Sequence, residues 1–405
     1  MDQNVFSPAR ILLPRGGFEK WSVVACDQYT SQPEYWEETA RITADAPSAL
    51  RLILPELYLG RQDTAGRVAR IHAEMDKVLR DGVLDTFDNA MVYVERTQSD
   101  GTVRRGLVGA LDLLAYDFRP GSRSPVRATE GTVLSRIPPR LQVREGAKLE
   151  LPHILVLIDD PDFSVIEPLA GQALPLLYDF NLMQGGGHIR GRLVGEEQFP
   201  QIQSALRGLR GADGGLWFAV GDGNHSLATA KTAYENLRGG MTEDEWLAHP
   251  ARYALVELCN LRDSAISFEP IHRIVFGVHP EELLGFLRSA GEGSGSPQQA
   301  GYVTASERGT LTFAHPTSNL AVGTLQNLLD AYLAEHPGAE VDYIHGEDAV
   351  ESLARRPDAV GFLLPPIGKE ELFPTVEKDG VLPRKTFSMG HAQDKRYYLE
   401  AREIL

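Results

Sequence analysis

A strand, a polar turn and a helix follow one another without a linker around the stretch AVGDGNHSLATAK, residues 219–231. The apolar run Leu216–Val220 predicts a buried strand. Apolar residues at steps of three and four predict a helix with one apolar stripe over residues 224–237. Similar strand and helix signals alternate along the whole chain. This order predicts a mixed α/β protein of the α+β type.

The turn between strand and helix carries groups suited to binding an anion. Gly221 and Gly223 permit backbone angles that other residues resist, and they leave room for a ligand to approach the main chain. Amide groups at a helix start, together with the positive end of the helix dipole, bind anions. Asp222 can hold a metal ion or accept a hydroxyl proton, and His225 can donate to a phosphate or exchange a proton.

The alternative interpretation is a plain strand-to-helix turn in which Asp222 or Asn224 only caps the helix. A cap needs one polar side chain, whereas this turn also contains His225 and Ser226. The turn lacks the GK[ST] ending of a Walker A loop and the third glycine of a dinucleotide fingerprint. Neither of those nucleotide sites is therefore predicted.

A basic segment over residues 119–148 contrasts with the net charge of -16 of the chain. It contains seven basic residues against only Glu130 and Glu145. Around Arg127, Thr129 and Glu130 the loop is poor in apolar residues, so the arginine could grip a phosphate and the glutamate could act as a base or a metal ligand. The alternative is a solvated basic surface with ordinary salt bridges.

Three further residues are weighed individually. Lys385, in PRKTFSMGH, offers a mobile phosphate-binding cation, with an ordinary surface lysine as the alternative. We expect His153, which is next to a proline, to be packed rather than catalytic. Asp27 could cap a helix just as well as belong to a functional site. The eleven histidines show no HExxH spacing, so no dedicated zinc site is predicted.

Length and composition limit the function classes. A chain of 405 residues exceeds what one hydrophobic core usually holds. Its acidic charge disfavours nucleic-acid and membrane-surface partners. Cys26 and Cys259 lie far apart, which excludes a disulfide scaffold. The sequence contains no apolar run of about 18 residues, and we expect a cytoplasmic protein.

The most linker-like stretch is EGSGSPQQAG, residues 292–301. We expect a boundary there, with an N-terminal α+β region over residues 1–291 and a C-terminal α/β subdomain over 301–405. A strand, helix, strand pattern over residues 341–366 supports the subdomain. Residues 90–95 and 107–111 predict a β-hairpin, and residues 167–183 predict a helix.

Several blocks together resemble one bacterial family. These are VACDQYTSQPEYW, VRATEGTVLSRIPPRL, LELPHILVLIDD, GDGNHSLATAK, FEPIHRIVF, VDYIHGEDAV and LPRKTFSM, in this order. The chain, from about Phe18 onward, resembles the domain of unknown function family number 1015. Members more commonly have Asp-Gly-His-His-Arg where this chain has residues 222–226. That version is similar to the nucleotide-binding turn of the free serine kinases in the ParB/sulfiredoxin superfamily.

This resemblance implies a ParB/sulfiredoxin-like nucleotide-binding core and an additional C-terminal subdomain. It also implies phosphoryl transfer from ATP or ADP to serine or a similar hydroxyl compound, with Mg²⁺ bridging the phosphates and Asp222 as its possible ligand. The implied catalytic residues are Glu130, Asp222 and His225. The implied phosphate-binding residues are Gly221, Gly223, Asn224, Ser226, Arg127, Thr129, Arg136 and Lys385.

Two residues depart from the family's turn. Asn224 replaces the first histidine and Ser226 replaces the arginine, so one phosphate-gripping cation is missing. Arg127, Arg136 or Lys385 could substitute. The departures favour the alternative of a non-catalytic regulator that binds a nucleotide or an anionic metabolite. Sulfiredoxins carry a cysteine at the place of Asn224, so the resemblance argues against sulfinic acid reduction here.

Overall fold

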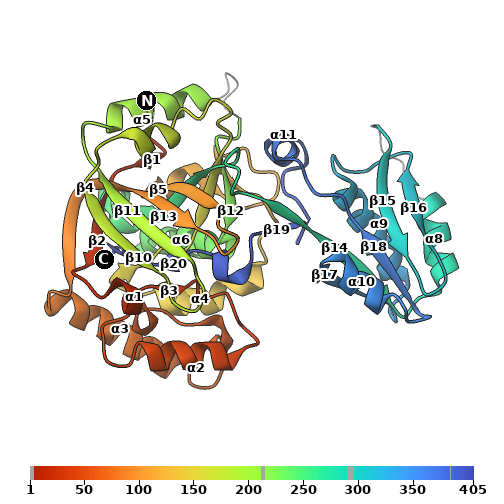
Figure 1. Ribbon diagram of the computed structural model, residues 1–405, viewed down its shortest axis with the longest axis horizontal. Helices are drawn as coiled ribbons and strands as arrows, with labels where there is room; N and C mark the ends of the chain where they lie inside the picture. The colour runs from red at the N-terminus through yellow and green to blue at the C-terminus, as the bar shows by residue number, and fades with distance from the viewer. Residues whose placement is uncertain (1–3, 211–214, 290–295, 384) are drawn as a thin grey trace. The chain divides into compact units, whose positions relative to one another are not determined.

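The computed structural model describes residues 4–210, 215–289, 296–383 and 385–405, which divide into two compact units (Figure 1). Unit 1 consists of the described residues within Met1–Ala128, Thr132–Ile266 and His391–Leu405. Unit 2 consists of those within Thr129–Gly131 and Ser267–Gly390. The chain thus leaves unit 1, forms most of unit 2, and returns. Both units combine helices with sheets, so the predicted mixed α/β class is confirmed.

Unit 1 is built around one large sheet. Its strands run in the order β10-β11-β4-β5-β13-β9-β12-β7-β6, and β1 and β2 add to β5 and β4. Their bounds are β1 Phe6–Ser7, β2 Ala9–Pro14, β4 Leu84–Thr97, β5 Val103–Asp112, β6 Tyr116–Asp117, β7 Val126–Ala128, β9 Leu155–Ile158, β10 Leu176–Asn181, β11 His188–Val194, β12 Phe218–Asp222 and β13 Tyr253–Asn260. Two small pairs join β3 Val23–Val24 to β20 Tyr397–Tyr398, and β8 Leu149–Glu150 to β21 Arg402–Glu403.

Helices cover this sheet on both faces. The helices of unit 1 are α1 Phe18–Trp21, α2 Pro33–Ile42, α3 Thr64–Arg80, α4 Ile137–Arg144, α5 Phe199–Leu209, α6 Asn224–Leu237 and α7 Glu243–Ala248. Side chains alternate across a strand, and Val92 of β4 packs into one core with Met75 of α3. Its neighbour Met91 packs into the other core with Tyr234 of α6. The second core therefore holds α6 against the sheet.

Most local predictions in unit 1 are confirmed. The predicted hairpin is the antiparallel pair β4 and β5, and the predicted helix over 224–237 is α6. The helix predicted over 167–183 is wrong. Residues Glu167–Gly171 form a short 3₁₀ helix, and β10 follows Pro175. Buried Tyr178 and Phe180 alternate there with exposed residues, which is the period of a strand rather than a helix.

Unit 2 has a sheet of its own, in the order β16-β15-β18-β14-β17, with β19 added to β14. The predicted strand, helix, strand pattern corresponds to β17, α10 and β18. The elements are β14 Phe268–Phe276, β15 Gln298–Val303, β16 Arg308–Phe313, β17 Glu340–His345, β18 Ala359–Leu363, β19 Phe387–Met389, α8 Pro280–Ser289, α9 Ala321–Glu335, α10 Glu347–Leu353 and α11 Lys369–Asp379.

The boundary expected at residues 292–301 stays a prediction. This segment follows α8 in unit 2. Its first residues fall in 290–295, outside the described part of the chain, and residues 298–301 belong to β15. Both β14, which precedes the segment, and β15 pair with β18.

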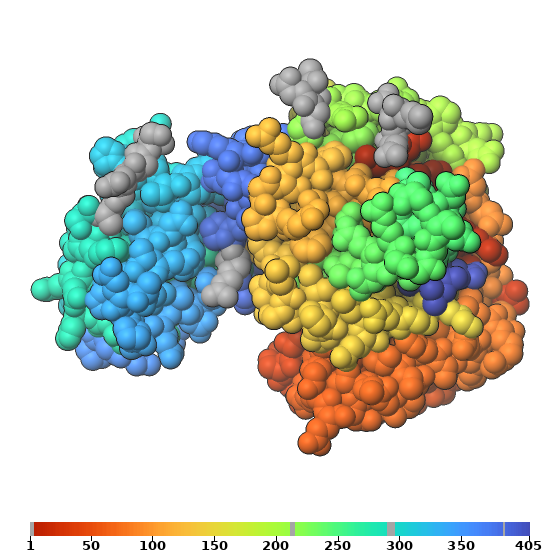
Figure 2. Space-filling model, turned by 180° about the vertical axis from the view of Figure 1, so that it is seen from behind, coloured from red at the N-terminus to blue at the C-terminus, as the bar shows by residue number. Residues whose placement is uncertain are grey.

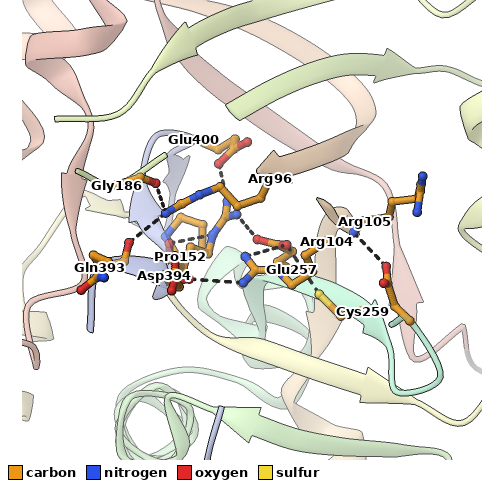
Figure 3. Close-up of polar contacts among 12 residues, drawn as sticks. Arg96, Arg104, Arg105, Pro152, Gly186, Glu257, Cys259, Gln393, Asp394 and Glu400 are labelled. Carbon is orange, nitrogen blue, oxygen red and sulfur yellow. Dashed lines mark hydrogen bonds and ion pairs between the residues drawn. The ribbon is translucent and has the colours of Figure 1, made fainter. Parts of the chain in front are cut away.

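A buried cluster of charges fastens the segment after Gly390 into unit 1 (Figure 3). Glu257 of β13 lies between Arg104, at 3.3 Å, and Arg396. Arg396 also pairs with Glu400, which accepts a hydrogen bond of 2.7 Å from the hydroxyl of Tyr178. All five side chains are buried. Charges in such surroundings are stable only when paired, so the returning segment is an integral part of this core.

In the part of the chain that the structure describes, no helix combines the length and apolar character needed to cross a membrane.

Candidate functional site

The glycine turn between β12 and α6 has the geometry that its sequence requires. Gly223 precedes α6 with φ 77°, in the left-handed region that favours glycine. A Cβ atom at this position would lie 3.0 Å from Cγ1 and 3.1 Å from Cα of Ile154. Backbone conformation and close packing therefore both call for a glycine here.

The first turn of α6 keeps its amide groups available. Asp222 Oδ1 accepts a hydrogen bond of 2.9 Å from the amide of Gly223, and no side chain in the described structure caps the helix. The alternative interpretation, a side-chain cap by Asp222 or Asn224, therefore does not describe this helix start. The first intrahelical bond runs from the amide of Leu227 to the carbonyl of Gly223, at 3.0 Å. The amides of residues 224–226 precede it and have no acceptor within the helix.

Asp222 is held by a lysine from the returning segment. Lys395 Nζ lies 3.1 Å from Asp222 Oδ2, and the two side chains are 12% and 23% exposed. Burial raises the pKa of Asp222, but the charge and hydrogen bond of Lys395, the electrostatic interaction with His153 and the hydrogen bond from the amide of Gly223 together lower that pKa below its ordinary value, so the carboxyl is ionised at neutral pH. Sequence reasoning missed Lys395, since no motif spacing connects it to the turn.

His225 lies in positive surroundings. Its Nε2 accepts a hydrogen bond of 3.2 Å from the amide of Val133. Burial and then the charges of Arg140 and Arg136 lower the pKa of His225 to about 4, against the opposing charge of Asp27. The imidazole is therefore neutral at pH 7, and its Nδ1 carries the proton. Arg136, predicted from sequence as a phosphate ligand, is thus brought close to the turn.

His153 connects the same helix start to a buried tyrosine. Its Nε2 lies 2.9 Å from Ser226 Oγ, and its Nδ1 lies 2.8 Å from the hydroxyl of Tyr398. The hydroxyl of Tyr398 also accepts a hydrogen bond of 3.1 Å from the amide of Cys26. His153 is only 8% exposed, so it is packed as expected. Its bond to Ser226 was not expected.

A cavity of about 150 Å³ lies beside Ser226 and His153 within unit 1. Its lining is mainly aliphatic and includes Leu52, Leu54, Leu59, Met75, Leu149 and Leu255. The charged residues in the lining are already paired, Arg140 with Glu56 and Arg144 with Glu150 at 2.6 Å. The cavity therefore offers an apolar interior.

The basic segment over residues 119–148 is partly neutralised in the structure. Besides Arg140 and Arg144, Arg119 pairs with Asp117 at 2.9 Å. These three residues therefore form the ordinary salt bridges that the alternative interpretation expects. Arg136 is exposed, and within the described ranges no carboxylate lies at ion-pair distance from it. Figure 2 shows α4, in yellow, beside α6 and α7, in green, on one face of unit 1.

Arg127 and Thr129 belong to a strand next to the turn and to its continuation. Arg127 lies in β7, which runs parallel to β12 and places Arg127 opposite Ala219. Its side chain is buried, and Nη1 donates a hydrogen bond of 3.3 Å to the carbonyl of Ser122. Thr129 is buried in unit 2, where its carbonyl accepts a bond of 2.7 Å from the amide of Leu382.

The structure brings Glu130 together with the segment that contains Lys385. Glu130 Oε1 accepts a hydrogen bond of 3.4 Å from the amide of Thr386, inside unit 2. Lys385 is exposed and has φ 55°. The predicted residues thus divide between the units, with Glu130 and Lys385 in unit 2 and Asp222 and His225 in unit 1. A shared reacting centre for these four residues stays a prediction.

Within the described residues, no group of three or more histidine, cysteine, aspartate or glutamate side chains is arranged to hold a metal ion.

Comparison with known protein families identifies the family of this chain. Residues 7–332 match the model of the family described as "Protein of unknown function (DUF1015)". The chain belongs to this DUF1015 family. The family predicted from the sequence blocks is therefore confirmed, and no curated protein matches the chain.

Solved structures show only distant likenesses to this DUF1015 protein. A mutant of free serine kinase in complex with AMP is 11% identical, with a TM-score of 0.39, over 72% of this chain and 90% of that chain. The same kinase in complex with ADP is 12% identical, with a TM-score of 0.38 over the same shares. SbnI from Staphylococcus aureus, with a C-terminal truncation, is 12% identical, with a TM-score of 0.36 over 70% and 82%. Likenesses at this level carry no argument about function.

Proposed function

We propose that unit 1 binds a nucleoside phosphate at the start of α6 and transfers a phosphoryl group to serine or another small hydroxyl compound. The observation that carries the proposal is the first turn of α6, where the amides of residues 224–226 have no helical acceptor and no side-chain cap. A helix start of this kind, entered through glycines, is suited to phosphate oxygens. Asn224 and Ser226 contribute their amides to this binding, and Gly221 and Gly223 keep the approach open.

Cationic groups around the turn support an anionic ligand. Arg136 and Arg140 are close enough to His225 to lower its pKa, and Lys395 lies against Asp222. A phosphate placed among them would be neutralised by these charges. His225 is a neutral donor through Nδ1, and a bound phosphate would raise the pKa of His225 toward its ordinary value. His225 would then hold the transferred group more strongly.

Asp222 is better suited to bind a magnesium ion that enters together with the nucleotide than to hold a permanently bound metal ion. Mg²⁺ usually takes one or two protein carboxylates, with phosphate oxygens and water completing its shell. Asp222 is ionised and supplies one such carboxylate, and Lys395 fixes its position. When bound, the ion neutralises charge on the phosphates.

The roles of the remaining predicted residues are proposed from the sequence alone. Glu130 is proposed as the base that accepts the proton of the acceptor hydroxyl, and Lys385, Arg127 and Thr129 as further phosphate ligands. Cys26 and Cys259 are free thiols, which suits a reducing cytoplasm as the proposed location.

A second candidate is a non-catalytic regulator that binds a nucleotide or an anionic metabolite. The observation that favours it is the pair Asn224 and Ser226, which stand where the motif that this turn resembles carries cationic residues. Binding would then occur through the amides and Arg136 without turnover.

Calorimetric titration with ATP, ADP and AMP, with and without Mg²⁺, tests the common part of both candidates. A charged hydrogen bond contributes about 1.5–3 kcal/mol, so Arg136→Ala is expected to weaken binding about 10- to 100-fold. Arg207→Ala, an exposed arginine on α5, is the matched control and should bind as the wild type does. Phosphoserine formed from L-serine supports the kinase, whereas binding without turnover supports the regulator. No binding of any nucleotide refutes the nucleotide site.

A further inference from the structure

The side chains of Ser226, His153 and Tyr398 form an arrangement that the nucleotide site does not use, since Ser226 contributes only its amide to that site. Their atoms follow one another at hydrogen-bond distances, 2.9 Å from Ser226 Oγ to His153 Nε2 and 2.8 Å from His153 Nδ1 to the hydroxyl of Tyr398. A serine, a histidine base and a third group that orients the base are the components of an activated nucleophile. We propose that Ser226 is the nucleophile of an ester-cleaving site that opens into the apolar cavity of unit 1.

The hydrogen bonds around Tyr398 are compatible with the protons that this chemistry needs. The tyrosine oxygen accepts the amide hydrogen of Cys26, at 3.1 Å, and its other partner is Nδ1 of His153. In this proposal, His153 Nδ1 is the donor of that second bond. The second lone pair of the tyrosine oxygen is then available for the Nδ1 hydrogen of His153. With Nδ1 protonated, Nε2 presents a lone pair to the hydroxyl hydrogen of Ser226.

Burial keeps the orienting group in one protonation state. Tyr398 is 2% exposed, and burial followed by the interaction with Cys26 raises the pKa of its hydroxyl well above the usual value. The tyrosine therefore stays neutral across the working pH range. Tyr398 is a positioning residue because it acts on the reacting atoms only through His153.

The cavity indicates which electrophile this site would accept. Ser226, His153 and Thr229 line it together with aliphatic side chains, and its arginines are paired with glutamates. A charged substrate would leave its own charge without a partner there, whereas an apolar acyl group would not. Aliphatic cavities of roughly 150 Å³ hold a group of the size of a benzene ring. The substrate class is therefore a carboxylic ester with a small apolar acyl group, such as a butanoyl or benzoyl ester.

The reaction proceeds in two balanced steps. Ser226 Oγ forms a bond to the ester carbonyl carbon while its proton passes to His153 Nε2. The bond between that carbon and the alcohol oxygen breaks, and the alcohol takes the proton from His153. In the second step, water adds to the acyl carbon of acyl-Ser226 and gives a proton to His153 Nε2. The bond between that carbon and Ser226 Oγ breaks, and Oγ takes the proton from His153. The sum is ester plus water giving carboxylic acid plus alcohol.

Covalent labelling with an alkyl fluorophosphonate tests the nucleophile without any nucleotide. The serine oxygen displaces fluoride, and mass spectrometry of the peptides locates the phosphonyl group. We expect the label on Ser226 of the wild type, no label in Ser226→Ala, and unchanged labelling in Ser204→Ala, an exposed serine on α5 that serves as the control. Loss of a general base slows such a step about 10²- to 10⁴-fold, so His153→Gln should label slower by that factor.

The remaining measurements separate catalysis from folding. Each variant is first compared with the wild type by thermal melting, so that a loss of folding is not taken for a loss of labelling. Labelling of the wild type tests the nucleophile without any substitution. In Tyr398→Phe, the loss of the Nδ1 partner should shift the pH profile of labelling, which a purely structural role would leave in place. Hydrolysis of 4-nitrophenyl butanoate should follow the same order among the variants.

Three results would overturn the assignment. These are absence of the label from the wild type, a label on another residue, and equal labelling rates in wild type and a well-folded His153→Gln. Because no nucleotide is added, labelling of Ser226 would stand even if titration found no nucleotide binding. Equally, nucleotide binding without labelling would leave the proposed function intact and remove this site.

Discussion

His225 allows one prediction to be worked out in full, because its imidazole is held neutral by the fold. An ordinary histidine has a pKa near 6.5, and burial with the charges of Arg140 and Arg136 lowers the pKa of His225 to about 4. The difference of about 2.5 units corresponds to at most roughly 3 kcal/mol at about 1.4 kcal/mol per unit, because water screens the charge of a partly exposed ring. Between these two pH values the unfolded chain binds more protons than the folded protein.

The sign of the effect follows from this difference. Above pH 6.5 the imidazole is neutral in both the folded and the unfolded state, so it does not lower the free energy of unfolding. As the pH falls from 6.5 to 4, protonation increasingly favours the unfolded chain, and below pH 4 the full loss of at most about 3 kcal/mol is reached. His225→Gln keeps an acceptor for the amide of Val133 but cannot take up a proton. It should therefore lose less stability over this range than the wild type.

Urea denaturation at pH 7, 6, 5 and 4 measures the free energy of unfolding of both proteins. Carboxylates and the other histidines titrate in both, so the difference between the two pH curves isolates His225. NMR of the ring protons gives the pKa directly, and saturating nucleotide should raise it. The reasoning is refuted if the ring of His225 titrates near pH 6.5, or if the two stability curves run parallel.

Two further substitutions probe the packing that supports the site. Arg396→Met leaves Glu257 and Glu400 without their shared guanidinium in a buried position, and should cost about 3–5 kcal/mol in urea unfolding; a loss below about 1 kcal/mol would contradict the assigned pairing. Gly223→Ala forces a side chain into a left-handed backbone with Ile154 only 3.0 Å away. It should cost at least about 1–2 kcal/mol, visible as a lower melting temperature, and an unchanged melting temperature would count against the turn geometry.

Local sequence patterns predicted the elements of the site because periodicity is a local property. The strand and helix around Gly223 follow from apolar spacing over a few residues, and the hairpin of β4 and β5 likewise. The failure at residues 167–183 has the same origin. An apolar run broken by Pro175 is compatible with either element, and only pairing with β11 decides that Tyr178 and Phe180 belong to a strand.

The contacts of the site could not be predicted in the same way, because they join distant segments. Lys395 reaches Asp222 from the returning segment, and Tyr398 reaches His153 from the same segment. No motif spacing in the sequence predicts either contact. His153 itself was expected to be packed, and its burial agrees. Its second role depends on Ser226, which only the fold places at its Nε2.

The position of unit 2 within the chain has a consequence for the order of synthesis. A ribosome releases residues 267–390 before it releases the segment that contributes Lys395, Arg396 and Tyr398 to unit 1. While the second unit is made, Glu257 therefore has only Arg104 of its two arginine partners, and one core of unit 1 is incomplete. Asp222 acquires its lysine and His153 its tyrosine only at that late stage. A nascent chain stopped after unit 2 would thus lack both partners, and the contacts around the turn at Gly223 would remain incomplete until synthesis had passed this point.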